Sequence, residues 1–339
     1  MSSKYVKKRQ VGNKTELVID YLNFPILYKY YSIKEHSVNA LFNDEIWATI
    51  PSHFNDPYDS VVCFDERSVK KYIKDNLTNE RFEKYQYLFN TNSKTTIIEN
   101  IACTLANGFK QARDIYAIAC FSEGVNSEIM WAHYANNAKG FALAYDGKLI
   151  YELSKSCYQQ ANEIIRNIDW LGIGKFEYSN PQNDLVTILP IQYCSGKVCA
   201  DTRIKKSIDF LFDFYDTLEI TTDINPIAEI FKKMKENKYI EEDNSFIYST
   251  FGVKNTCWRY EKEWRILTYN LNPFNMSNSP YICIGNLTPK ALYLGEYISE
   301  YDKLALIEIA KQKGLPVYQM KTKMYKNRCK LIPILIQET

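Results

Sequence analysis

Acidic and basic side chains alternate over residues 260–266, which makes this segment the clearest candidate for chemistry in the chain. The surrounding apolar and aromatic residues predict a strand over about 258–269, and strand side chains alternate between two faces. Glu261, Glu263 and Arg265 would then share one face. Burying two carboxylates and a guanidinium costs free energy, so a buried row of this kind would favour a functional role.

Two interpretations of this acidic row stay open. A carboxylate in a dry pocket can act as a general base or can stabilise a cation that forms during a reaction. The alternative is a row of ion pairs on a half-exposed strand, which is common and contributes little to stability. For the first interpretation, we expect Glu263 to face a secluded cleft beside Tyr28, Lys29 and Asn55.

The loop over residues 53–59 is dense in side chains that bind their own backbone. It contains Asn55 and Asp56, and Pro57 restricts the residue before it to extended conformations. One interpretation is a pocket wall that offers an amide and a carboxylate to a ligand. The other is a well-capped structural loop.

A further polar segment follows a predicted central strand, at whose end Ser122 lies. Asn126 or Ser127 then caps a short helix that carries Trp131, His133 and Tyr134. These aromatic residues could line a pocket for a ring-shaped ligand. Alternatively, Trp131 belongs to the core and His133 makes a polar contact.

The composition is that of an ordinary globular protein. The 339 residues are 46% apolar and 24% charged, and the formal net charge of +2 gives no global electrostatic reason to bind nucleic acid or an anionic membrane. No apolar run approaches the roughly 18 residues of a membrane span, and the amino terminus lacks an apolar signal core. We therefore expect a cytoplasmic protein with no membrane contact. Glycine-rich phosphate loops and zinc-type Cys–His spacings are absent from the sequence, so no metal site is expected.

The predicted elements mix helices and strands without a steady β-α-β rhythm. This order favours an α+β fold with a mixed, largely antiparallel central sheet and with inserted and flanking helices. We divide the chain into an arm over 1–25 and a single α+β domain over 26–339, with helical insertions near 66–113, 155–168 and 202–237. We expect strands at 26–31, 45–50, 115–121, 141–146, 185–193, 258–269, 281–284, 291–294, 315–319 and 330–335.

An ordered set of motifs runs through most of the chain. They are LYKY at 27–30, FNDPYD at 54–59, CFSE at 120–123, MWAHYA at 130–135, KGF at 139–141, YD at 145–146 and WRYEKEWR at 258–265. This pattern resembles a widespread bacterial domain family of unknown function. The resemblance covers about residues 26–300, and an ordered set is more specific than any one motif. It implies no function by itself.

The order of elements also resembles the ADP-ribosyltransferase fold, especially the branches that act on nucleic acid. That order is a Leu-Tyr-X-aromatic strand, a helix, a second strand, a polar loop, a strand that ends in serine, and a late strand with a glutamate. The resemblance implies an ADP-ribosyltransferase-like sheet and an NAD-dependent transferase or NAD glycohydrolase, of the kind found in toxins and anti-phage effectors. NAD, or a related nucleotide, would be the substrate. The acceptor, protein or nucleic acid, is not named by the sequence.

The resemblance also implies roles for individual residues. Glu263, or Glu261, would stabilise the ribosyl cation that forms when nicotinamide leaves. Lys29 stands where the family offers His or Arg, and it lacks the guanidinium fork that grips a phosphate. The residues expected to contact NAD are Tyr28, Tyr30, Asn55, Asp56, Ser122, Trp131, His133 and Arg265.

Two alternative functions stay open at this point. The same fold could serve as a non-catalytic module that senses nucleotides or binds other proteins. Alternatively, Asp56, Asp59, Glu261 and Glu263 could hold metal ions in a nuclease, since two-metal sites use carboxylate clusters.

Overall fold

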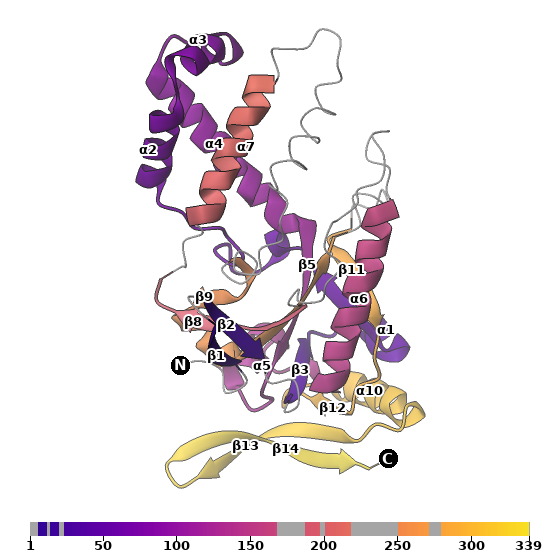
Figure 1. Cartoon of the computed structure of the whole chain (residues 1–339). Helices are drawn as coiled ribbons and strands as arrows, with labels where there is room; N and C mark the ends of the chain where they lie inside the picture. Colours follow the sequence, from indigo (N-terminus) through magenta and orange to yellow (C-terminus); the bar gives the residue numbers. More distant parts are fainter. Residues whose placement is uncertain are drawn as a thin grey trace.

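One large sheet forms the centre of the computed structural model (Figure 1). The structure describes residues 6–11, 14–19, 24–167, 187–196, 201–217, 250–270 and 279–338. In this part of the chain the large sheet has ten strands. They are β3 (Ile26–Tyr31), β4 (Glu45–Thr49), β5 (Tyr116–Ser122), β6 (Phe141–Asp146), β7 (Ile188–Pro190), β10 (Glu263–Tyr269), β11 (Tyr281–Asn286), β12 (Ala291–Leu294), β13 (Val317–Tyr325) and β14 (Arg328–Gln337).

Strand β5 is the branch point of this sheet. One edge of β5 pairs along its whole length with β10, and the other edge of β10 pairs with β7. The opposite edge of β5 is shared, because β3 pairs with it at Ser122 and β4 pairs with it at Ile118. From β3 the sheet continues through β6, β12 and β13 to β14, and from β4 it continues to β11. Only the β12–β13 pair is parallel among these strands, so the predicted α+β fold with a mixed, largely antiparallel sheet is confirmed.

Helices and two small sheets complete the described part of the fold. Strands β1 (Val6–Val11) and β2 (Lys14–Ile19) form an antiparallel pair within the predicted arm, and β8 (Gln192–Cys194) pairs in parallel with β9 (Val253–Asn255). The α-helices are α1 (Glu35–Asn43), α2 (Glu66–Asn76), α3 (Asn79–Leu88), α4 (Lys94–Ala112), α5 (Glu128–Tyr134), α6 (Gly147–Asn167), α7 (Asp201–Thr217) and α10 (Glu300–Gln312). Three short 3-10 helices are η2 (Pro51–His53), η3 (Arg113–Ile115) and η5 (Thr256–Glu261).

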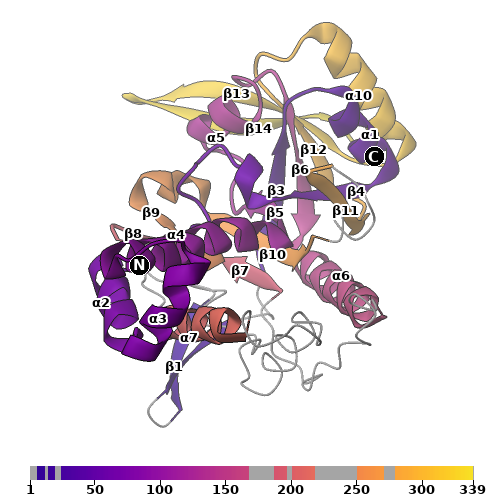
Figure 2. The ribbon, with the colours of Figure 1, turned by 90° about the horizontal axis from the view of Figure 1, so that it is seen from above.

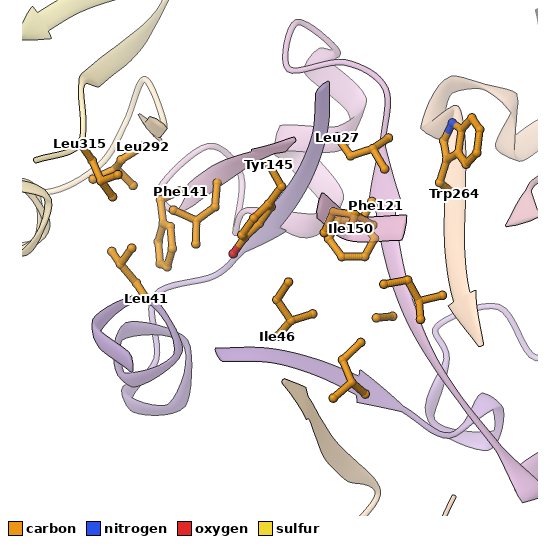
Figure 3. Close-up of a cluster of buried hydrophobic side chains, with 14 of the residues drawn as sticks. Leu27, Leu41, Ile46, Phe121, Phe141, Tyr145, Ile150, Trp264, Leu292 and Leu315 are labelled. Carbon is orange, nitrogen blue, oxygen red and sulfur yellow. The ribbon is translucent and has the colours of Figure 1, made fainter. Parts of the chain in front are cut away.

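The core of the sheet lies against helices α1, α6 and α10. Figure 3 shows how Leu27, Phe121 and Tyr145 from the strands meet Leu41 from α1 and Ile150 from α6. Helix α10 adds further buried side chains to the same cluster, so all three helices cover one side of the strands. Strand β5 carries a near-continuous apolar run, which is typical of a central strand, and this explains its position at the branch point.

Helices α2, α3, α4 and α7 form a separate layer with its own apolar core (Figure 1, Figure 2). The stretch 66–113 was predicted to be helical, and three helices occupy it because Thr78 caps α3 by accepting a hydrogen bond from the backbone amide of Arg81. Helix α6 covers the predicted stretch 155–168 as far as Asn167, begins earlier than predicted, and is followed by residues outside the described ranges. Helix α7 covers the first part of 202–237, and the remainder lies outside the described residues.

Several other predicted elements are confirmed, and some are corrected. Strands were found at each predicted position, although only residues 187–193 of the stretch 185–193 are described, and these are divided between β7 and β8 at Ile191. Ser127 caps α5 as expected, since its hydroxyl accepts a hydrogen bond from the backbone amide of Met130. Strands β13 and β14 are longer than predicted. Within the described ranges, no helix has the length and apolar character to cross a membrane.

Candidate functional site

The backbone of the predicted acidic row changes conformation at Lys262. Helix η5 ends there, Lys262 adopts a left-handed conformation with φ of +44°, and β10 begins at the next residue. The prediction of one strand over 258–269 is therefore wrong in its first half, because the 3-10 helix replaces the extended chain. Glu263 and Arg265 share a strand face as predicted, whereas Glu261 reaches the same buried region from η5.

Arg265 is the centre of a buried ion network, and its side chain is fully inaccessible to solvent. Its Nη1 and Nη2 atoms donate hydrogen bonds to the two carboxylate oxygens of Asp59 at 2.8 and 2.6 Å. Its Nε and Nη2 atoms donate to the carboxylate of Glu263 at 2.7 and 3.1 Å. A third acceptor is the carbonyl of Phe251, 2.9 Å from Nη1. The planar guanidinium suits such paired contacts, so Arg265 fixes the loop after η2 against β10.

Lys254, at β9, is the second cation of this network. Its Nζ atom donates hydrogen bonds to Oε2 of Glu261 at 2.7 Å and to Oε2 of Glu263 at 3.2 Å. The same atom lies 3.3 Å from Oδ2 of Asp59, and the Lys254 side chain is only 5% exposed. Lys254 therefore contacts all three carboxylates. We use the term buried ion network for the five residues Asp59, Glu261, Glu263, Lys254 and Arg265.

The buried ion network contains three carboxylates and two cations, and this imbalance sets the protonation of its members. Burial acts to raise the pKa of Asp59 and of Glu263, but Arg265 and Lys254 outweigh it and hold both values below the ordinary range. Burial, followed by the Glu263 carboxylate, raises the pKa of Glu261 to about 7. Glu261 is therefore the member of the network that gains and loses a proton near neutral pH.

Tyr134 connects Glu261 to the polar loop. The Tyr134 hydroxyl donates a hydrogen bond of 2.5 Å to Oε1 of Glu261, and it accepts one of 3.3 Å from Nδ2 of Asn55. The next residue along, His133, has its Nδ1 atom 2.9 Å from the hydroxyl of Tyr260. The structure thus brings together the loop over 53–59, helix α5 and helix η5, which are distant in the sequence.

A pocket of about 370 Å³ opens next to the buried ion network. Asp59 and Lys254 belong both to its wall and to the network, and the Nζ atom of Lys254 lies 4.8 Å from the centre of the Trp258 ring. Asp56 is held in the wall by a turn in which its carboxylate accepts a hydrogen bond from the backbone amide of Tyr58. The lining residues are Asp56, Tyr58, Asp59, Cys194, Ser195, Gly196, Val253, Lys254, Asn255, Cys257 and Trp258.

The pocket differs from the cleft expected beside Glu263. Among the described residues, its wall does not include Glu263, Tyr28, Lys29 or Asn55. The reason is the tight pairing of Glu263 with two cations, which leaves its side chain only 5% exposed. The network reaches the pocket through Lys254 and Asp59 instead.

Three predicted positions do fall in one row across neighbouring strands. Tyr28 on β3 pairs with Ser122 on β5, and Ser122 pairs with Glu263 on β10. Directly opposed residues point to the same face of a sheet, so these three share a face. The Ser122 hydroxyl donates a hydrogen bond of 2.6 Å to the backbone carbonyl of Glu261, which anchors η5 to the end of β5.

Other residues that were expected to contact a ligand lie inside the fold. Trp131 is 1% exposed, and its indole N–H donates to the carbonyl of Val125. Tyr30 packs against Trp131 edge to face, and its hydroxyl donates to the carbonyl of Gly124. Lys29 donates a hydrogen bond of 3.4 Å to the carbonyl of Cys120, and burial lowers its pKa. The structure does not bring these side chains to the pocket.

Sequence reasoning missed Lys254 and Tyr193, and it gave Trp258 no role at the site although Trp258 begins the last motif. The Tyr193 hydroxyl accepts a hydrogen bond of 2.8 Å from the backbone amide of Glu263. Lys254 lies in a short strand, and no motif or regular spacing in the sequence distinguishes it from the other lysines of the chain. Trp258 begins the segment that leads to YEKEWR, which is the only signal that could have drawn attention to it.

Comparison with known families gives a match to part of the chain. Residues 130–266 match the model of a family described as "Protein of unknown function (DUF2971)". This part of the chain includes most of α5 and the residues Lys254, Glu261 and Arg265, whereas Asp59 lies before it. The expected resemblance to a family of unknown function is thus confirmed for these residues. No curated protein and no solved structure matches the chain, and the comparisons name no ADP-ribosyltransferase.

Proposed function

We propose that this chain is an enzyme that cleaves the nicotinamide–ribose bond of NAD or a related nucleotide, as a transferase or a glycohydrolase. One observation carries the proposal: Glu261 is a buried carboxyl group whose pKa is raised to about 7, and it accepts a hydrogen bond from Lys254, which lines a pocket of about 370 Å³. A group with a pKa near the working pH is an efficient general acid or base. Shifted carboxyl groups of this kind are concentrated at functional sites.

The pocket offers contacts that suit a nucleotide. Its volume lies within the range of small-molecule sites, which is roughly 300–1,000 Å³. Trp258 and Tyr58 provide aromatic faces for a base or a nicotinamide ring, and Lys254 provides a positive charge for a phosphate or a ribose hydroxyl. The proposal therefore places the ligand against Lys254, whose Nζ atom also donates a hydrogen bond to Glu261.

The proposed chemistry assigns different tasks to the two glutamates. When the bond between C1′ and nicotinamide breaks, its electron pair leaves with nicotinamide, and the ribose becomes an oxocarbenium-like cation. For this step one Glu261 oxygen must exchange its bond to Tyr134 or Lys254 for the substrate; the carboxylate then stabilises that cation and accepts the proton from the acceptor hydroxyl that attacks C1′. Glu263 holds Lys254 and Arg265 in place, and it does not act on the substrate because two cations occupy its oxygens.

The shared row of Tyr28, Ser122 and Glu263 supports the choice of NAD as substrate. The resemblance to ADP-ribosyltransferases implies Lys29, Ser122 and Glu263 as the three strand positions. Ser122 and Glu263 are directly opposed, and Tyr28, an expected NAD contact, lies opposite Ser122, whereas Lys29 follows Tyr28 on β3 and points to the other face. The roles differ from those expected, since Glu261 replaces Glu263 as the reacting carboxylate. Ser122 positions Glu261 through its bond to the Glu261 carbonyl.

A nucleotide-sensing module without turnover is the second candidate. The observation that favours it is the complete pairing of Asp59 and Glu263 with Arg265 and Lys254, which is typical of a structural ion network. The nuclease alternative lacks such support. Within the described parts of the chain, no group of three or more His, Cys, Asp or Glu residues could hold a metal ion.

The test is the release of nicotinamide from NAD, measured by liquid chromatography, together with calorimetric titration of NAD binding. We expect release by the wild-type chain, faster above pH 7 than below it, and none by Glu261→Gln. The matched control is Glu83→Gln on the exposed surface of α3, which should leave release unchanged. Binding without release would favour the sensing module, whereas absence of both binding and release would refute the proposal.

A further inference from the structure

The hairpin formed by β13 and β14 carries an isolated concentration of positive charge. It extends from the sheet at the end opposite the layer of α2, α3, α4 and α7 (Figure 1). Residues 321–330 contain five cations and no acid, whereas the whole chain has a formal net charge of only +2. We call these cations the basic ribbon: Lys321, Lys323, Lys326, Arg328 and Lys330.

The pairing of the two strands gathers these charges on one face. Lys323 lies directly opposite Lys330, and Arg328 pairs two positions further along the same face. Opposed like charges are unfavourable in an antiparallel pair, so this arrangement works against the stability of the hairpin. Among the described residues, Lys323, Lys326 and Arg328 form no ion pair with an acid, and all three are exposed. An anionic partner would relieve this repulsion.

The base of the hairpin is firmly attached to the sheet. Met320 and Leu331 are buried in a cluster with Trp131. The backbone amide and the hydroxyl of Thr322 donate hydrogen bonds of 3.0 and 2.6 Å to the carboxylate of Glu296. The basic ribbon therefore projects from a fixed support. A surface that is held in this way binds a partner without a large loss of conformational entropy.

We propose that the basic ribbon is a docking surface for double-stranded nucleic acid. The major groove of a duplex is about 12 Å wide and admits a two-stranded β-ribbon, with phosphates along both sides of the groove. Cations on both strands of the ribbon would meet those phosphates. A membrane surface fits less well, because Met324 is the only large apolar residue exposed among the charges of the described tip, and stable membrane attachment also requires buried apolar area. This proposal is independent of the chemistry assigned to Glu261.

The test is the binding of a fluorescent 20-base-pair duplex of mixed sequence, followed by anisotropy between 50 and 200 mM salt. With contacts from Lys323, Lys326, Arg328 and Lys330, the slope of log K against log salt should be about −3.6, and binding should weaken on the order of 100-fold over this range. The variant Lys323→Gln/Lys326→Gln/Arg328→Gln should reduce the steepness of that slope by about 2.7, at about 0.9 for each lost contact.

A control variant that loses the same number of charges elsewhere distinguishes an effect of the basic ribbon from an effect of the net charge of the protein. The variant Lys74→Gln/Lys110→Gln/Lys148→Gln removes three exposed lysines from α2, α4 and α6, and it should retain the wild-type slope. Equal loss of binding in both variants would overturn the proposal. It would also be overturned by absence of duplex binding, or by tighter binding to vesicles containing phosphatidylserine or to polyglutamate than to the duplex.

Discussion

The raised pKa of Glu261 makes a quantitative prediction about stability. An ordinary glutamate has a pKa of 4.5, and Glu261 in the folded chain has a pKa of about 7. Below pH 4.5 both the folded and the unfolded chain hold this proton, and above pH 7 neither does. Between these values only the folded chain holds it, so each pH unit lowers the free energy of unfolding by about 1.4 kcal/mol. Over the whole window this residue makes the protein less stable by about 3 kcal/mol.

The substitution Glu261→Gln removes this titration and keeps an oxygen that can accept the hydrogen bond from Tyr134. Urea denaturation at several pH values between 4.5 and 8 measures the free energy of unfolding of both proteins. The difference between variant and wild type should shift in favour of the variant by about 3 kcal/mol as pH rises through the window. Other titrating groups largely cancel in this difference.

A control substitution shows whether the buried position is responsible. Glu83→Gln removes one carboxyl from the exposed face of α3, and its difference from wild type should not follow the pattern of Glu261→Gln. A flat difference for Glu261→Gln across the same range would refute the reasoning. It would mean that Lys254 stabilises the Glu261 carboxylate enough to cancel both its burial and the repulsion from Glu263.

Two further substitutions test the parts of the buried ion network. Arg265→Met leaves Asp59 and Glu263 buried without their main cation. The free energy of unfolding, measured by urea denaturation, should therefore fall by about 3–5 kcal/mol. A loss below about 1 kcal/mol would contradict the assigned pairing. Tyr134→Phe removes the hydrogen bond to Glu261, which should lower the free energy of unfolding by about 1–3 kcal/mol. The same change should raise the pKa of Glu261 further, and the NMR signal of its carboxyl carbon follows that titration. An unchanged titration would show that this hydrogen bond does not affect the Glu261 carboxyl group.

The sheet and its central strands could be predicted from the sequence because their signals are local. The apolar run at 115–121 indicates a central strand, and β5 indeed occupies the branch point of the sheet. The alternation of Glu263 and Arg265 with apolar residues placed both on one face, although it left open whether that face is buried, as the structure has it. Ser127 could be assigned as a cap because a hydroxyl before a helix satisfies a backbone amide that otherwise lacks a partner.

The composition of the ion network could not be predicted, because its members are distant in sequence. Asp59 pairs with Arg265 across 206 positions, and no local pattern connects them. The left-handed turn at Lys262 was also missed, since lysine has no preference for that conformation. This turn places Glu261 beside Lys254. Whether Glu261 holds a proton near neutral pH therefore depends on tertiary contacts, and these cannot be inferred from the periodicity of the sequence.

The charge imbalance of the network bears on the choice between an enzyme and a structural module. A network that served stability alone would be better with glutamine in place of Glu261, because the buried carboxylate costs about 3 kcal/mol above pH 7. Asp59 and Glu263 do not share this cost, since Arg265 and Lys254 compensate them. Local departures from the most stable arrangement are concentrated at functional sites, where an unfavourable group performs a task. The unfavourable member here is the one next to the lysine that forms the pocket wall, and this position favours catalysis over support.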